Sequence, residues 1–307
     1  MSYLTIFTAP KPFTNAHIAT IQRNAIASWK QLGKDVNIVL LGNGPGIAEA
    51  AAEMQVQHIP GVRLNSQGTP IIGSMFDLTR KAYPSQTYMI INTDIIVYPE
   101  ILASIKQVSG QTGQFLIVGQ RWDLDLENRL DYSTGWENRL QEQVRGKGKL
   151  HPRGGSDYFI FPESCYKSIP DFAIGRAGWD NWMIYEGRRR GWHVIDATHD
   201  IQIIHQNHDY SHLPDGKPHY KLPETFENVR LAGGERTIFT LADTDTVLID
   251  NRLGKTGWEW NKFWREVEIF PLIRVKSYAL AQLFYAIFHP VRAYRDLRSW
   301  LWKKPKS

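Results

Sequence analysis

Residues 88–97 read YMIINTDIIV, and this stretch decides the fold. It begins as a continuous hydrophobic run, which is typical of a strand buried on both faces of a parallel sheet. Three polar residues, Asn92, Thr93 and Asp94, then interrupt the run. Polar groups directly after a buried strand are expected at the sheet edge where open α/β sheets bind ligands. The stretch therefore predicts both a parallel sheet and the place of its site.

The segments around this stretch alternate between strand-like and helix-like patterns through the first 120 residues. Short apolar runs predict further strands at 4–8, 36–41, 56–59 and 115–119. Apolar residues at helical spacing predict helices at 15–32, 47–54, 70–83 and 99–108. This alternation predicts an α/β fold with a mostly parallel sheet flanked by helices.

The alternation ends after residue 119. Residues 127–149 are polar and mixed in charge, which favours an excursion of the chain over the site. Further on, the pattern predicts strands at 156–161, 192–196 and 201–205, and a helix at 180–190 that ends at Gly191.

The charge of the chain is concentrated at one end. The 307 residues include 36 Lys and Arg against 31 Asp and Glu, a net +5. Residues 290–307 alone contain six basic residues and one acidic residue, so the rest of the chain is balanced. A neutral body offers no continuous basic groove for a phosphate backbone, so we expect no nucleic acid partner.

The single cysteine, Cys165, excludes an intramolecular disulfide and favours a reducing compartment. Residues 1–8 lack the basic start and apolar core of a signal peptide and read as a strand. We therefore expect a cytoplasmic protein.

Asp94 is the first candidate for chemistry, because a hard divalent cation prefers oxygen ligands and could join this carboxylate to a phosphate. His205 and His208 follow a predicted strand, where a neutral imidazole can complete the coordination of a metal. The alternatives are a turn-forming aspartate and a polar surface loop.

Asp180 is the second candidate. It lies near a predicted helix start between Trp179 and Trp182, and aromatic faces beside a carboxylate are a common way to bind sugars. The alternative is a simple N-cap. Hydrolase and dinucleotide-binding functions lack their motifs: no nucleophile elbow, Walker loop or Gly-x-Gly-x-x-Gly after a strand is present.

Several short segments occur in an order that resembles a nucleotide-sugar glycosyltransferase of the GT-A type, similar to family 2. They are TAP at 8–10, LGNGPG at 41–46, NSQGTP at 65–70, INTDI at 91–95, GSDYFIFP at 155–162 and GWDNW at 178–182. The resemblance covers about residues 4–212.

The resemblance implies a GT-A fold, a UDP- or GDP-sugar donor, and a Mn²⁺ or Mg²⁺ ion. It assigns the metal to Asp94 with His205 or, as second choice, His208. It makes Asp180 the general base of an inverting reaction, or the residue that orients the acceptor in a retaining one. The implied donor-binding residues are Thr8, Ala9, Pro10, Asn43, Gly68, Thr69, Asn92, Thr93 and Asp94, and the implied acceptor-binding residues are Asp157, Trp179, Asn181 and Trp182.

One feature departs from the family. Its Asp-x-Asp motif corresponds to Asn92-Thr93-Asp94, in which Asn92 replaces the first acid. An asparagine can still bond a ribose hydroxyl but adds no negative charge. Reduced metal affinity, or metal independence, therefore stays open.

The C-terminal segment carries its own pattern. Residues 277–291 have no charged side chain, and fifteen such residues are too few to span a bilayer. Residues 291–302 place apolar and tryptophan side chains against arginines, as in a helix on an anionic membrane surface. The alternative is a helix packed on the body. The apolar face of the first part consists of Leu280, Leu283, Phe284, Ile287 and Phe288.

Together these patterns predict a catalytic domain at 1–220, with a nucleotide-sugar half at 1–120 and an acceptor half at 121–220. A linking segment at 221–270 and amphipathic, basic, membrane-associating helices at 271–307 follow. The predicted function is metal-assisted transfer of a sugar to a glycan or glycolipid, as in polysaccharide biosynthesis, by a peripheral protein on the inner face of a membrane. The alternative is a non-catalytic sugar- or lipid-binding protein on the same scaffold.

Overall fold

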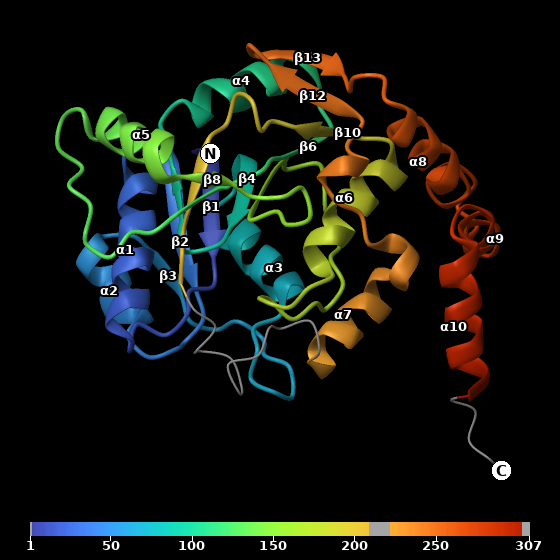
Figure 1. Cartoon of the computed structure of the whole chain (residues 1–307). Coiled ribbons are helices and arrows are strands. Elements are labelled where there is room, and N and C mark those ends of the chain that lie inside the picture. Colours follow the sequence, from blue (N-terminus) through green and yellow to red (C-terminus); the bar gives the residue numbers. More distant parts are fainter. Residues whose placement is uncertain (1, 209–221, 303–307) are drawn as a thin grey trace.

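A large twisted sheet flanked by helices forms the body of the protein (Figure 1). The structure is a computed structural model that describes residues 2–208 and 222–302, with side chains up to residue 298. It confirms the predicted mixed α/β class with a mostly parallel sheet.

In the described part of the chain, the main sheet has nine strands in the order β13-β12-β10-β6-β9-β4-β1-β2-β3. Strands β9 and β13 pair antiparallel to their neighbours, and the other pairs are parallel. The carboxyl ends of β1, β2 and β4 therefore meet at one edge of the sheet, as predicted. The strands are β1 Ser2–Thr8, β2 Val36–Leu41, β3 Gln57–Ile59, β4 Ser85–Ile91, β6 Phe115–Val118, β9 Tyr158–Pro162, β10 His193–Asp196, β12 Thr246–Ile249 and β13 Arg252–Lys255.

Two hydrophobic cores cover the two faces of this sheet. Alternate residues along each strand enter different cores: Ile6 packs with α1, α2 and α4, whereas Phe7 packs with α3 and α6. The helices begin and end close to the predicted limits. They are α1 Ala16–Lys30, α2 Ile47–Met54, α3 Ile72–Ala82, α4 Ile101–Gln111 and α6 Trp179–Arg190.

A second, four-stranded sheet corrects two predictions. Residues 88–97 are not one strand, because β4 ends at Ile91 and β5 (Ile95–Val97) joins the second sheet in the order β5-β11-β7-β8. Residues 127–149 are not a mere excursion, because α5 (Trp136–Lys147) packs on this sheet through Trp136, Leu140 and Val144. The other strands are β7 Trp122–Leu124, β8 Lys149–Leu150 and β11 Ile203–Gln206.

The segment 221–270, predicted as a link, instead adds strands to the main sheet. Its described residues include α7 (Pro223–Ala232), β12 and β13, and β12 pairs in parallel with β10. After these come α8 (Trp260–Phe270), a π-helical turn (Pro271–Val275), α9 (Tyr278–Phe288) and α10 (Pro290–Trp302). In Figure 1, α10 extends away from the body.

A buried ionic contact joins α8 to the body. Arg188 of α6 is 5% exposed and binds Glu266 of α8 at 2.7 Å and Asp245 at 3.3 Å. Removing the partners of a buried charge costs several kcal/mol, so this contact fixes α8 against α6.

Candidate functional site

The crossing from the main sheet to the second sheet positions Asp94. The chain leaves β4 at Ile91, turns through Asn92, Thr93 and Asp94, and enters β5 at Ile95. Thr93 Oγ1 lies 2.8 Å from Thr8 Oγ1 at the end of β1, which ties this turn to the neighbouring strand. Asp94 is 7% exposed. The polar interruption in the hydrophobic run thus marks the carboxyl end of a central strand, as predicted.

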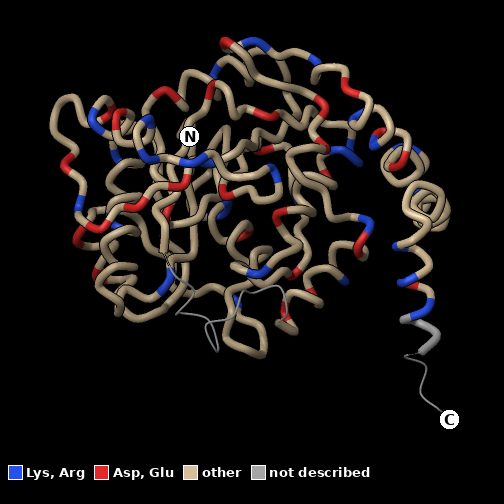
Figure 2. Tube along the Cα trace, in the orientation of Figure 1, with Lys and Arg blue, Asp and Glu red and all other residues tan. Residues whose placement is uncertain are grey.

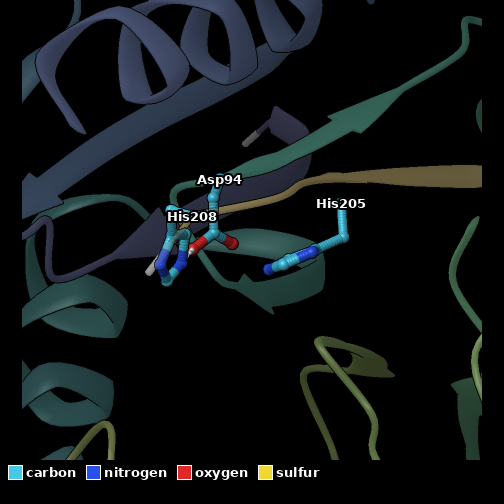
Figure 3. A group of neighbouring side chains, drawn as sticks. All are labelled: Asp94, His205 and His208. Atoms are coloured by element: carbon cyan, nitrogen blue, oxygen red, sulfur yellow. Dashed lines mark hydrogen bonds and ion pairs between the residues drawn. The ribbon is translucent and has the colours of Figure 1, made fainter. Parts of the chain in front are cut away.

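His205 is brought to Asp94 by strand pairing. In the antiparallel pair of β5 and β11, His205 lies opposite Ile95, next to Asp94 in the chain. The ligand atoms of Asp94, His205 and His208 all lie within 4.8 Å of one another. Figure 3 shows the outer nitrogen of the His205 ring pointing toward the Asp94 carboxylate.

Asp123 fixes the orientation of His205. Its Oδ1 lies 3.2 Å from His205 Nδ1, and a carboxylate can only accept, so Nδ1 carries the proton. In the neutral ring, Nε2 then keeps its lone pair on the side of Asp94. A carboxylate behind a histidine in this way is the usual outer partner of a metal-binding imidazole.

His208 and Lys11 complete the group. His208 Nε2 lies 3.1 Å from Asp94 Oδ2, and the rings of His205 and His208 are 5.5 Å apart between centroids. Lys11 Nζ lies 2.9 Å from His208 Nε2 and 3.6 Å from Asp94 Oδ2. The site therefore contains one carboxylate, two imidazoles and one ammonium group.

The charges in the site favour an ionised Asp94. Burial works to raise the pKa of this carboxyl, but contact with His208 and the charges of His205 and Lys11 outweigh burial and hold the pKa far below its usual range. For His205, burial works to lower the pKa, but the bond to Asp123 and the charge of Asp94 raise it overall.

The group fits a divalent metal. Among the described residues, no hydrogen-bond donor reaches the buried Oδ1 of Asp94, so this oxygen has an unused lone pair. The carboxylate suits Mg²⁺ or Mn²⁺, and the two imidazoles suit a transition-metal ion better than Mg²⁺. Asp94 and His205 would hold such an ion, with His208 as the third ligand.

The contacts of Asn92 account for an amide at this position in place of an acid. Its Nδ2 donates to Asp157 Oδ1 at 2.7 Å, and Arg121 binds the other Asp157 oxygen at 2.6 Å. An aspartate at position 92 would face the Asp157 carboxylate at hydrogen-bond distance, and two like charges would repel. We predicted that Asp157 binds the acceptor, but both its oxygens are engaged and it is 7% exposed, so it holds Asn92 and Arg121 instead.

Asp180 lies in the first turn of α6 but is not its N-cap, a position that Gly178 occupies. The Gly178 backbone N–H donates to Asp180 Oδ1 at 3.1 Å. Burial raises the pKa of the Asp180 carboxyl to about 6; contacts with the N–H groups of Asn181 and Gly178 lower it, and the charge of Asp157 adds to the rise. A carboxyl with a pKa near neutrality is suited to accept and release a proton.

The tryptophans beside Asp180 do not form a sugar-binding surface. Trp179 and Trp182 are each 7% exposed, because positions three apart share the helix face that packs on the sheet. Their rings contact Phe159 and Phe172 in the core. Asn181 also differs from its prediction, since its amide donates to the carbonyl of Phe239 at 2.7 Å and holds α6 in place.

The predicted donor residues lie in three places. Thr8, Ala9 and Pro10 end β1 beside Thr93, and Asn43 is exposed after β2, the neighbouring strand. Gly68 and Thr69 lie in a loop before α3, where the positive φ of Gly68 (+81°) allows a tight turn. The loop is bound to α7, because Asn65 donates to Glu224 at 2.6 Å.

Sequence reasoning missed Lys11, Arg121, Asp123 and His151. His151 Nδ1 lies 2.8 Å from Asp123 Oδ2, so Asp123 bridges two histidines, and Arg121 contacts it from a third side at 2.9 Å. Lys11 had a usable signal, because a lysine between two prolines directly follows the first strand. Asp123 had none, because its strand was not predicted.

Comparisons with known proteins give structural likenesses only. No protein-family model matches the chain, and no curated protein matches it. A crystal structure of glucosyl-3-phosphoglycerate synthase from Mycobacterium tuberculosis is similar over 76% of this chain and 81% of that chain, with 14% identity and a TM-score of 0.48. The same enzyme with Mn²⁺, UDP and phosphoglyceric acid gives 14% identity over 76% and 79%, and a TM-score of 0.47. A mannosyltransferase from Pyrobaculum calidifontis with GDP-Man and Mn²⁺ covers 66% of this chain and 56% of that chain, with 11% identity and a TM-score of 0.41.

Proposed function

We propose that the protein is a GT-A type glycosyltransferase that moves a sugar from a nucleoside-diphosphate sugar to a hydroxyl of a glycan or glycolipid. The observation that carries the proposal is the convergence of Asp94, His205 and His208, with Asp123 behind His205, at the ligand edge of a mostly parallel sheet. A metal ion held by this group would bind the diphosphate of a donor, and the segment resemblance implies a donor at the same edge.

In this proposal, Asp94 and the two histidines hold a Mn²⁺ or Mg²⁺ ion. When bound, the ion neutralises the charge that gathers on the leaving UDP or GDP. The exposed Asn43 contacts the base, whereas Thr8 is buried and holds Thr93. Asn92 contacts the ribose through its Oδ1, since its Nδ2 is bound to Asp157.

Asp180 is the proposed general base. The acceptor hydroxyl must lose its proton as its oxygen attacks the anomeric carbon, and the Asp180 carboxylate takes that proton. The pKa of about 6 suits this role, because the group is ionised at neutral pH and is still a better base than an ordinary aspartate.

Asp94→Asn tests the proposal, because it removes the charge of the carboxylate and keeps its shape. We expect the variant to lose Mn²⁺ binding and transfer from any donor found by screening UDP- and GDP-sugars, with its circular dichroism unchanged. Asp35→Asn is the control, because Asp35 is exposed and lies before β2 begins, at the end of that strand away from the site. Full transfer activity in Asp94→Asn would overturn the proposal, and failure of both UDP and GDP to bind would favour a non-catalytic sugar- or lipid-binding protein.

We also propose that the C-terminal helices lie on an anionic membrane on the cytoplasmic side. In the described part of the chain no helix is long and apolar enough to cross a bilayer. Apolar side chains nonetheless stay exposed along α8, α9 and α10, among them Trp264 at 49%, Leu283 at 55% and Ile287 at 64%. Figure 2 shows basic residues along α10, and these include Arg292, Arg295 and Arg298.

Tryptophan beside arginine is the expected composition of a helix at a lipid surface. Removal of residues 290–307 should release the protein from phosphatidylserine vesicles in a sedimentation assay with little change in UDP or GDP affinity. Neutral phosphatidylcholine vesicles are the control. Undiminished sedimentation of the shortened protein would refute this part of the proposal.

A further inference from the structure

Lys11 lies where a metal ion would contact the site. Its ammonium group can only donate, and the Asp94 carboxylate can only accept. His208 Nε2 is close to both, 2.9 Å from Lys11 Nζ and 3.1 Å from Asp94 Oδ2. When the ammonium donates to Nε2, it also attracts the carboxylate and so offsets the repulsion between the Nε2 lone pair and Oδ2. Lys11 then uses the same lone pairs that a metal would use.

The backbone of Lys11 is held in place. Gln22 of α1 is 2% exposed; its Oε1 accepts from the Lys11 N–H at 2.7 Å, and its Nε2 donates to the Lys11 carbonyl at 2.9 Å. Pro10 and Pro12 restrict the backbone on both sides. A buried polar side chain committed to one residue's backbone indicates that the position of this residue matters.

The charges of Lys11 and Asp94 indicate what Lys11 does beside the ligand group. Asp94 is the one carboxylate in the three-residue ligand group, and Lys11 balances its charge. A divalent ion added to the site would have to share this carboxylate with the ammonium, and two cations at close range in a buried site repel. A diphosphate brings the negative charge that would relieve this repulsion.

We propose that Lys11 is a built-in counter-cation that keeps divalent metal bound weakly until a nucleoside diphosphate arrives, whereupon its ammonium turns to the diphosphate oxygens. Metal and nucleotide then bind with strong positive coupling, and each raises the affinity for the other by the same factor. The nucleotide half of this inference rests on the proposed function, whereas the competition between Lys11 and metal does not.

The experiment measures Mn²⁺ binding by titration calorimetry and by the electron paramagnetic resonance of free Mn²⁺, with Mn²⁺ alone and with UDP or GDP added. Lys11→Met removes the charge and keeps most of the side-chain length, and Lys11→Gln is a second variant in case the first is unstable. Lys34→Met is the matched control. Lys34 is exposed and lies before β2 begins, whereas the site lies beyond the carboxyl end of that strand.

Wild-type protein and Lys34→Met should bind Mn²⁺ alone weakly. Lys11→Met should bind Mn²⁺ alone about tenfold more tightly or better, with a correspondingly smaller gain on addition of nucleotide. At saturating Mn²⁺, its affinity for the nucleotide should fall about tenfold, because a charge-assisted hydrogen bond is lost.

Equal Mn²⁺ affinity of Lys11→Met and wild type, while nucleotides still bind with metal, would overturn the inference and leave the proposed function standing. Tighter Mn²⁺ binding by Lys11→Met with no response to either nucleotide would support the competition and count against the proposed function. Absence of Mn²⁺ binding in all variants would overturn both, because the ligand group would then not be a metal site.

Discussion

Replacement of Asp180 with asparagine should make the protein more stable at pH 8 and greatly slow transfer. Burial in the fold raises the pKa of this carboxyl from 3.8 to about 6. One pKa unit corresponds to about 1.36 kcal/mol, so keeping Asp180 ionised costs the folded state about 3 kcal/mol at pH 8. Asparagine has nearly the same shape and its Oδ1 can still accept from Gly178, so the variant avoids this cost.

The sign depends on pH in a defined way. Between about pH 4 and pH 6 the folded protein holds a proton on Asp180 that the unfolded chain has lost, so the wild type loses stability as pH rises through this window. Below about pH 3 the carboxyl is protonated in both states, and the stability advantage of the variant disappears. The advantage should grow across the window and level off above pH 7.

Urea unfolding followed by tryptophan fluorescence at pH 5 and pH 8 measures this difference. Glu49→Gln is the matched control, because Glu49 also lies in the first turn of a helix, α2, but is exposed. Loss of the Glu49 charge should destabilise the protein slightly, by about 0.3–1 kcal/mol, because this charge interacts favourably with the helix dipole. In transfer assays, Asp180→Asn should lower kcat by about 10²-fold or more, and wild-type kcat/KM should fall below about pH 6.

Two results would refute this reasoning. A stability difference between Asp180→Asn and wild type that does not change with pH would mean that Asp180 is not held at a raised pKa. A variant that is more stable and also fully active would support the raised pKa of Asp180 but would show that Asp180 is not the general base.

Three further outcomes follow from the site and its surroundings. Asp123→Asn should weaken Mn²⁺ binding by about 10–100-fold, because His205 loses the carboxylate that orients it, while Asp35→Asn, at an exposed position before β2, should not; equal affinities would refute the positioning role. Trp182→Ala should cost about 3–5 kcal/mol in urea unfolding with little change in Mn²⁺ affinity; unchanged stability with weaker acceptor binding would instead make Trp182 an acceptor-binding residue. Trp264→Ser should reduce binding to phosphatidylserine vesicles without changing UDP or GDP affinity, and unaltered vesicle binding would exclude α8 from the lipid surface.

Much of the fold was predictable because strand and helix periods are strong local signals. The Asn15 cap of α1 and the limits of α2 could be predicted from local sequence alone. The break inside residues 88–97 could not, since both halves are equally hydrophobic and only the three-dimensional arrangement sends β5 to a second sheet. Helix α5 was missed because its apolar stripe consists of only three residues.

Some residues of the candidate site could likewise be predicted from the sequence, and others could not. Asp94 became a candidate because a carboxylate directly after a buried strand falls at the ligand edge of a parallel sheet. His205 became one because it follows a predicted strand, and the family resemblance added support. Trp179 and Trp182 are buried in the core, which could not be predicted because sequence does not tell an aromatic residue on a core face from one beside a ligand. The roles of Lys11 and Asp123 depend on contacts between segments far apart in the chain, which no local pattern encodes.

The contact between Arg188 and Glu266 sets a limit on how far the chain can be shortened. A protein cut before α8 would leave Arg188 buried with Asp245 as its remaining acidic partner, on the same helix that carries Asp180. A cut at residue 290 keeps Glu266, and also keeps Glu268, which binds Arg265 at 3.1 Å. Purification of a form without α10 should therefore be feasible, whereas removal of α8, α9 and α10 together would leave Arg188 without Glu266 and so damage α6, the helix that holds the proposed base.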